Sequence, residues 1–313
     1  MSKATKTPMG LFGNSLKLGL LAFSLAWVHH AESQPPLELE MALPLEGDEI
    51  LQPSGLALAD GQLYLVSAKH DDQIFSVQLG QDRAEYKEAL KITRPDDASS
   101  LKLVWRGIAG DGHGQWLLIS ETAYRVLKVD KGGKSEWMGP SVLDAGTEIG
   151  LFGGDHSGPD GLACLGENSL LIGASREPRG LIAMQLSGEK VKIEPMKCDS
   201  SKTKVQVGRK ADFTDLDFSG HTLFALVGSA DAVCSLKKRE DGKITEDQCW
   251  SYAATAQDPK YRYRGLKGIG RGLASDQGRL YVVLDNKGLA READPKDRRP
   301  LLLVFKRPAA SHP

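Results

Sequence analysis

The stretch "SGLALADGQLYLVSA", Ser54 to Ala68, decides the fold, because its pattern returns near the other end of the chain as "RGLASDQGRLYVVLD", Arg271 to Asp285. Each copy has a short apolar segment, a turn that contains glycine, and a longer apolar segment. Three further copies begin between these two, at Arg106, Asp160 and Thr214. The copies are 52, 54, 54 and 57 residues apart when measured at Leu56, Ile108, Leu162, Leu216 and Leu273. A near-constant period of this size indicates a propeller, a solenoid or another array.

The content of the repeat favours β-strands. The apolar segments "LYLV", "WLLI" and "LYVV" are rich in strand-forming residues, and several copies continue into a third apolar segment such as "QIFSVQL" at 73–79. No long stretch keeps apolar residues at helical spacing. We therefore predict an all-β protein, a single β-propeller of five blades, or of six if one copy is degenerate. The predicted inner strands lie near 55–59, 107–110, 161–165, 214–218 and 272–275.

Two apolar segments outside the repeats predict how the ring closes. "LELEMALP" at 37–44 precedes the first copy, and "LLLVFKRP" at 301–308 follows the last. Each looks like a strand without a partner in its own repeat. Pairing of these N- and C-terminal strands would close the ring and leave no exposed sheet edge.

The chain begins with features of an export signal. Three lysines precede the apolar segment Leu18–Val28, and a small-residue sequence follows at 31–33. The eleven apolar residues are too few to span a bilayer, for which about 20 are needed. We predict a signal peptide at 1–33, a propeller at 34–306 and a flexible tail at 307–313, in an exported protein that is periplasmic or secreted and has no stable membrane anchor after cleavage. The net charge of −1, from 40 basic and 41 acidic residues, gives no sign of a nucleic-acid partner.

Four cysteines remain after the predicted cleavage, and an exported chain favours disulfides. Asp241-Gly242 is a strong hairpin signal midway between Cys234 and Cys249, so folding there places these two cysteines opposite each other. We predict this bond and, for the remaining pair, a bond between Cys164 and Cys198. Four buried free thiols are the alternative.

Charged residues recur where the apolar pattern of each repeat stops. In a propeller the loops before the inner strands and after the second strands meet at one mouth of the central channel. We therefore expect a small-molecule ligand to bind there, with an anion as one candidate. The candidate ligand-binding residues are Lys69, Glu121, Asp160, Arg176, Asp215, Arg271, Asp285 and Asn286.

Three interpretations of this mouth are open. Arginines at corresponding positions could pair with the acids in a structural ring of salt bridges, or the mixed set could bind an anion. The third interpretation is a divalent cation, calcium for example, held by oxygen ligands. The candidate metal ligands are Glu121, Asp160, Asp215 and Asp285.

The phrases "GPDGLACLGENSLLIGASREPRG" and "GRGLASDQGRLYVVLDN", followed by "LLLVF", resemble the bacterial propeller family called esterase-like activity of phytase and a related group of uncharacterised exported propellers. The resemblance implies metal-assisted hydrolysis of esters or phosphoesters. In the family an acid often precedes the "GLA" phrase, and here only Asp160 keeps it. Neither a G-x-S-x-G nor an H-E-x-x-H motif occurs after residue 33, and no catalytic residue is assigned. The function classes are thus a ligand-binding propeller, a hydrolase of this kind, and an envelope scaffold that binds proteins through a blade face.

Overall fold

The computed structural model describes residues 34–47, 51–154, 157–176, 178–188, 190–203, 205 and 210–309. The predicted signal peptide lies outside these residues. Residues 34–309 form the compact unit discussed below. None of its helices is both long and apolar enough to cross a membrane.

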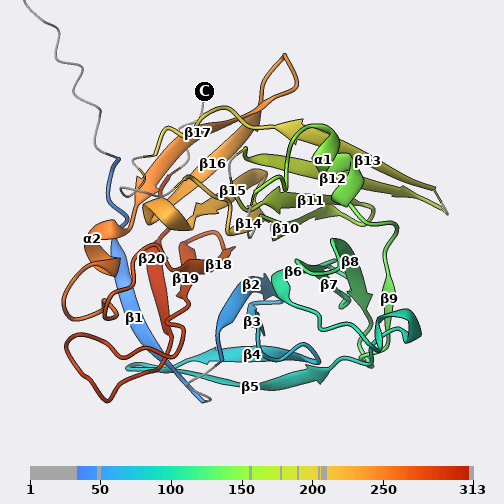
Figure 1. Ribbon diagram of the computed structural model, residues 1–313. Helices are drawn as coiled ribbons and strands as arrows, with labels where there is room; N and C mark the ends of the chain where they lie inside the picture. The colour runs from blue at the N-terminus through green and yellow to red at the C-terminus, as the bar shows by residue number, and fades with distance from the viewer. Residues whose placement is uncertain are drawn as a thin grey trace, which may run out of the picture. The chain divides into compact units, whose positions relative to one another are not determined.

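The unit is almost entirely β-structure, as predicted, and its antiparallel strands form five four-stranded blades (Figure 1). The innermost strands are β2 (Pro53–Ala59), β6 (Trp105–Gly110), β10 (Pro159–Gly166), β14 (Asp215–Ser219) and β18 (Gly270–Ser275). The second strands are β3 (Gln62–Ser67), β7 (Trp116–Ser120), β11 (Ser169–Ala174), β15 (Thr222–Val227) and β19 (Arg279–Leu284). The third strands are β4 (Gln73–Leu79), β8 (Arg125–Val129), β12 (Gly180–Ser187), β16 (Ala232–Lys238) and β20 (Leu301–Lys306). The outermost strands are β5 (Ala84–Lys91), β9 (Ser135–Trp137), β13 (Lys190–Lys197), β17 (Ile244–Ser251) and β1 (Leu39–Glu46).

Blades 1 to 5 are numbered here in the order of their innermost strands, so blade 5 consists of β18, β19, β20 and β1. Short helical segments lie in the connections: α1 (Leu143–Glu148), α2 (Ala253–Ala256) and two 3-10 turns, η1 (Asp96–Ala98) and η2 (Gly228–Ala230). Each innermost strand contacts that of the next blade, and β18 contacts β2, so the five innermost strands complete a cycle. The five predicted inner strands all overlap these innermost strands.

The ring closes as the sequence predicts. Strand β1 pairs antiparallel with β20, in a register that sets Ala42 opposite Leu303. Strand β1 also pairs in parallel with β5 of blade 1 at Leu45 and Ala84, which joins blades 5 and 1 into one eight-stranded sheet. The predicted tail is not wholly detached, because Arg307 packs on blade 4 with its guanidinium over the ring of Phe224.

The hydrophobic core lies between the blades rather than at the axis. Its five clusters each combine buried side chains of two adjacent blades. Leu226 of blade 4 packs with Leu273 of blade 5 in one cluster, for example. Alternating apolar residues on each strand fill these spaces, because successive side chains point to opposite faces of a sheet. This packing fixes the innermost strands around the axis and their ends at the two mouths.

Glycines at the start of the repeat allow the innermost strands to approach closely. A Cβ atom on Gly55 would lie 2.7 Å from the carbonyl oxygen of Arg106, and one on Gly107 would lie 2.7 Å from the amide nitrogen of Leu162. The fourth copy has Asp215 at the position of this glycine. Its carboxylate accepts hydrogen bonds from the amides of Leu56 in blade 1 (3.2 Å) and Leu273 in blade 5 (2.8 Å). Asp215 therefore joins three blades at the axis.

The cysteine predictions are half right. Cys234 and Cys249 lie opposite each other on β16 and β17 and form a disulfide, and Gly242 lies in the turn between these strands. The predicted second bond is wrong, because Cys164 and Cys198 are free thiols. Cys164 is on the innermost strand of blade 3 and Cys198 follows its outermost strand. Two strands intervene, and at about 4.8 Å per strand the cysteines are too far apart for a disulfide.

Candidate binding site at the channel mouth

A cavity of about 640 Å³ lies at the mouth where the innermost strands begin and the second strands end. Four blades contribute charged side chains to its wall, so the repeat itself brings them together. The five basic residues are Arg106, Arg176, Lys210, Arg271 and Lys287. The four acidic residues are Glu121, Asp160, Asp212 and Asp285.

Asp160 lies between two arginines of other blades. Its Oδ1 is 3.4 Å from Nε of Arg106, and its Oδ2 is 3.8 Å from Nη1 of Arg271. Arg106 is already engaged elsewhere, because its Nε and Nη2 donate to Oε2 of Glu121 at 2.8 and 2.5 Å. Consequently Oδ1 of Asp160, which is buried, has no hydrogen-bond partner among the described residues. A buried carboxylate oxygen without a donor is uncommon and suggests that something else contacts it.

Burial dominates the ionisation of this group. Removal from water raises the pKa of Asp160 to about 7, although Arg106 and Arg271 act in the opposite direction. Burial also raises the pKa of Asp285, against the amide of Lys287 and the charge of Arg271. Burial lowers the pKa of Arg106, but Asp160 and Glu121 outweigh it and the net shift is upward. Asp160 therefore keeps its proton to a much higher pH than an exposed aspartate does.

Arg271 is partly buried and only loosely paired. Its side chain is 23 % exposed, and its nearest carboxylate oxygen, on Asp160, is beyond hydrogen-bond distance. Within the described part of the chain the guanidinium makes no ion pair closer than this one. Lys210 and Lys287 are exposed at the rim and form no salt bridge with any described residue. Because a guanidinium presents five donors in a fixed plane, Arg271 offers a site for an oxyanion.

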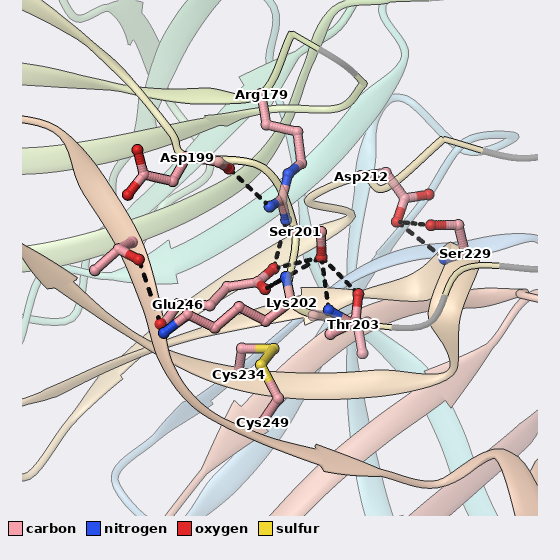
Figure 2. Close-up of polar contacts among 12 residues, drawn as sticks. Arg179, Asp199, Ser201, Lys202, Thr203, Asp212, Ser229, Cys234, Glu246 and Cys249 are labelled. Carbon is pink, nitrogen blue, oxygen red and sulfur yellow. Dashed lines mark hydrogen bonds and ion pairs between the residues drawn. A yellow bond between two sulfur atoms is a disulfide. The ribbon is translucent and has the colours of Figure 1, made fainter. Parts of the chain in front are cut away.

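A buried ion pair lies beside the start of the connection between β13 and β14 (Figure 2). Nη1 of Arg179, before β12, donates to Oε1 of Glu246, on β17, at 2.6 Å, and both side chains are almost fully buried. Glu246 also accepts from the hydroxyl of Ser201 at 2.9 Å and the amide of Lys202 at 2.6 Å. These bonds fasten the start of the loop after β13.

The other end of this loop is fastened at the mouth. Oδ1 of Asp212 accepts from both the amide and the hydroxyl of Ser229 at 2.9 Å, and Ser229 follows β15 (Figure 2). Asp212 is thus held close to the end of a second strand, where the repeat brings the cavity wall together. The loop is positioned by charge on one side and by hydrogen bonds on the other.

Five of the eight predicted site residues line the cavity: Glu121, Asp160, Arg176, Arg271 and Asp285. Lys69 does not, because its side chain is exposed and the preceding Ala68 forms the wall. Asn286 is fully buried, and its amide nitrogen donates to the carbonyl of Leu289 at 3.0 Å, so it supports the loop after β19. Asp215 lies at the axis rather than at the mouth, since its carboxylate is occupied by backbone amides of three blades.

The sequence interpretation missed Gln52, Lys210, Asp212 and Lys287. Gln52 directly precedes β2, Asp212 and Lys287 lie three residues before β14 and after β19, and Lys210 lies five residues before β14. Lys210 and Asp212 belong to a long connection before the fourth inner strand, for which the repeat gives no alignment. Asp212 had a detectable signal, because Thr214 and Asp215 made this the copy with the most polar approach.

Within the part of the chain that the structure describes, the mouth acids do not gather closely enough to form a group that could hold a metal ion. Among the described residues, the three ligand-type side chains that gather within 4.8 Å are those of Cys234, Glu246 and Cys249. There the two sulfurs are joined in the disulfide and Glu246 is paired with Arg179. The predicted ligands Glu121 and Asp160 face Arg106, and Asp215 is elsewhere. The donor set at the mouth thus fits a calcium ion poorly.

No protein-family model and no curated protein sequence matches this chain. Similar solved structures are propeller-like. The glutaminyl cyclase of Myxococcus xanthus has 10 % identity and a TM-score of 0.49, over 87 % of this chain and all of that one. The calcium-binding protein regucalcin of Agrobacterium tumefaciens has 12 % identity and a TM-score of 0.47, over 88 % and 96 % of the two chains.

A third similar structure is a gluconolactonase of Xanthomonas campestris, with 11 % identity and a TM-score of 0.43, over 86 % of this chain and 98 % of that one. At these identities the likeness concerns the fold alone. The findings agree with a propeller family and do not extend to the esterase-like activity of phytase family.

Proposed function

We propose that this protein is an exported propeller that binds a small anionic ligand at the mouth of its channel. The observation that carries the proposal is the state of Arg271, a largely buried guanidinium that faces the cavity without a hydrogen-bonded carboxylate. A carboxylate or phosphate oxygen at this point would accept hydrogen bonds from the guanidinium. Such charge-assisted hydrogen bonds are stronger than those between neutral groups.

The balance of charge supports an anion over a cation. The wall carries five basic and four acidic residues, a net charge of +1 when all are ionised. With Asp160 protonated the net charge becomes +2, and the neutral carboxyl can donate a hydrogen bond to the ligand. Glu121 and Asp212 already accept two hydrogen bonds each, so these two acids are occupied while Arg271 is available.

Export is part of the same proposal. The hairpin disulfide is typical of proteins that fold in an oxidising compartment. Together with the signal-like sequence at 1–33 it supports a periplasmic or secreted protein, which meets its ligand outside the cytoplasm.

The experiment is a thermal-shift titration with two defined anions, inorganic phosphate and citrate, at constant ionic strength. Binding to the native state at 100 times Kd adds about 2.7 kcal/mol of stability, which raises Tm by roughly 5–10 °C in a domain of this size. Arg271→Gln should abolish the shift. The matched control is Arg83→Gln, because Arg83 is an exposed arginine on the outer surface of blade 1. Equal shifts in the wild type and Arg271→Gln would refute the proposal, as would the absence of any anion-specific shift.

A calcium arm tests the metal-assisted hydrolase at the same time. We expect calcium and chelator to leave Tm unchanged, because the mouth acids face arginines rather than one another. A calcium-dependent rise in Tm that Asp285→Asn removes would favour a metal centre over the anion site.

A further inference from the structure

A second cavity of about 360 Å³ lies between blades 3 and 4. It is near the C-terminal ends of the innermost strands β10 and β14, so it opens away from the mouth that holds Arg271. Its floor is apolar, with Leu171 and Leu181 from blade 3 and Leu223 and Leu236 from blade 4. Phe218 at its edge is 37 % exposed, which is unusual for a large aromatic side chain.

The corresponding place between blades 4 and 5 is filled by the protein itself. There the guanidinium of Arg307 lies 4.9 Å from the ring centroid of Phe224 and donates to the carbonyl oxygens of Ser219 (3.0 Å) and Asp276 (2.6 Å). The strand registers identify the equivalent of Phe224 in blade 3. Phe224 pairs with Asp217, and Leu171 pairs with Ala163. Asp217 and Ala163 occupy the same position in their copies of the repeat, so Leu171 is the equivalent of Phe224. Leu171, however, faces the cavity.

The basic residue equivalent to Arg307 is present in blade 4 but points elsewhere. Arg307 directly follows Lys306, the last residue of β20, which pairs with Arg279. Lys238, the last residue of β16, occupies the equivalent position in blade 4. Nζ of Lys238 lies 3.3 Å from Oε1 of Glu194 on the outermost strand of blade 3. Lys192 approaches the same carboxylate at 3.1 Å. Lys238 therefore stands at the rim and leaves the apolar floor uncovered.

The rim is basic. Lys192, Lys237 and Lys238 line the cavity with Glu194 as the single carboxylate of the lining, and Lys237 is paired with Asp247 beside it, which leaves a net charge of +1 at the rim. Lys192 and Lys238 share Glu194, so one positive charge of this trio is not neutralised. An apolar floor with a basic rim is complementary to an amphiphile that has an anionic end. The volume lies in the range of small-molecule sites.

We propose that the groove between blades 3 and 4 binds an amphipathic carboxylate, with its hydrocarbon chain on Leu171 and its neighbours and its carboxylate at Lys238 and Lys192. This site is independent of the anion site at the mouth. The two differ in position, in the character of their walls and in the residues that would bind, so each can fail alone.

The probe is sodium decanoate, titrated calorimetrically into the full mature chain below its aggregation concentration, with decanol and butyrate as comparisons. We expect decanoate to bind at one site and butyrate not to bind, because butyrate lacks the chain that the floor accommodates. Decanol should bind at least fivefold more weakly, since it has no charge for the lysines.

Two variants locate the site. Ala183→Trp fills the cavity from β12 and should abolish decanoate binding. Ser169→Trp fills it from the start of β11 and replaces Ala183→Trp if that variant does not fold. Lys238→Glu replaces an attraction with a repulsion and should weaken decanoate binding by about fivefold to tenfold while decanol binding is unchanged. Lys87→Glu, an exposed lysine on β5, is the charge control and should match the wild type.

Four outcomes would overturn the proposal. They are the absence of decanoate binding, unchanged binding in both folded tryptophan variants, equal effects of Lys238→Glu and Lys87→Glu, and a dimer of the wild type that the tryptophan variants dissociate. The last outcome, measured by analytical ultracentrifugation, would assign the groove to a second copy of this chain.

Discussion

Substitution of Asp215 by alanine tests whether the axis of the ring is held together by this one side chain. The carboxylate accepts hydrogen bonds from the amides of Leu56 (3.2 Å), Leu216 (2.9 Å) and Leu273 (2.8 Å), which belong to the innermost strands of three blades. Asp215 is fully buried, so water cannot easily replace it. Asp215→Ala leaves the two inter-blade donors, Leu56 and Leu273, without this acceptor.

The magnitude follows from these two donors. A buried donor left without a partner costs about 1–3 kcal/mol, so two cost about 2–6 kcal/mol. Burial also raises the pKa of Asp215, which means that desolvation of the carboxylate already offsets part of its benefit. We therefore expect the lower part of this range, about 2–4 kcal/mol, which corresponds to a fall in Tm of roughly 4–16 °C in a domain of this size.

Thermal unfolding followed by far-UV circular dichroism and urea unfolding at 25 °C measure the effect. Asp215→Asn keeps one carbonyl oxygen as an acceptor and should lose less than half as much stability. Asp82→Ala, an exposed turn residue of blade 1, is the control and should stay within about 0.5 kcal/mol of the wild type. A Tm of Asp215→Ala within 2 °C of the wild type would refute the reasoning, because the amides would then have found other partners at no cost.

Three further results are expected. Asp160→Asn should be more stable than the wild type at pH 8 and close to it at pH 4. The raised pKa of Asp160 means that the folded wild type loses stability as pH rises from about 4 through 7, and the variant lacks this loss. Urea unfolding at several pH values measures the difference, and parallel pH profiles of the two proteins would contradict the prediction. Alkylation of the unfolded, non-reduced protein followed by peptide mapping should label Cys164 and Cys198 and spare the hairpin disulfide; a linked peptide containing either would be contrary evidence. Glu246→Gln should destabilise by about 3 kcal/mol or more, since it leaves the charge of Arg179 buried without its partner, and a loss below 1 kcal/mol in urea unfolding would argue against this.

The repeat made the fold predictable. Its phrase contains the information for two strands and their turn, and copies at a near-constant spacing imply equivalent places around one axis. Even the closing strands were identifiable, because 37–44 and 301–308 are apolar segments without a partner in their own repeats. The hairpin disulfide could also be predicted, since it depends only on a local turn and on the antiparallel register.

The site was less predictable because contacts between blades, rather than the repeat itself, decide which side chains line it. Asp215 lies at the start of its innermost strand, as Asp160 does, yet it occupies the position of the repeat's glycine, and its carboxylate binds amides at the axis. Asp212 is held by the amide and the hydroxyl of Ser229, 17 residues away in the sequence, and the repeat does not reveal this contact. The Cys164–Cys198 bond was inferred from what remained after the first pair, and elimination carries no geometric information.

The pairing of β1 with β20 determines when the ring can be completed. Residues near 40 pair with residues near 303, so this contact cannot form until the segment near 303 is available. Contacts between distant segments form slowly, because a long loop must close before they contribute stability. Until then β1 and β5 expose unpaired edges that other chains can bind. A ring closed in this way would therefore be most vulnerable to aggregation, and most dependent on a holding chaperone, in the interval before β20 is available.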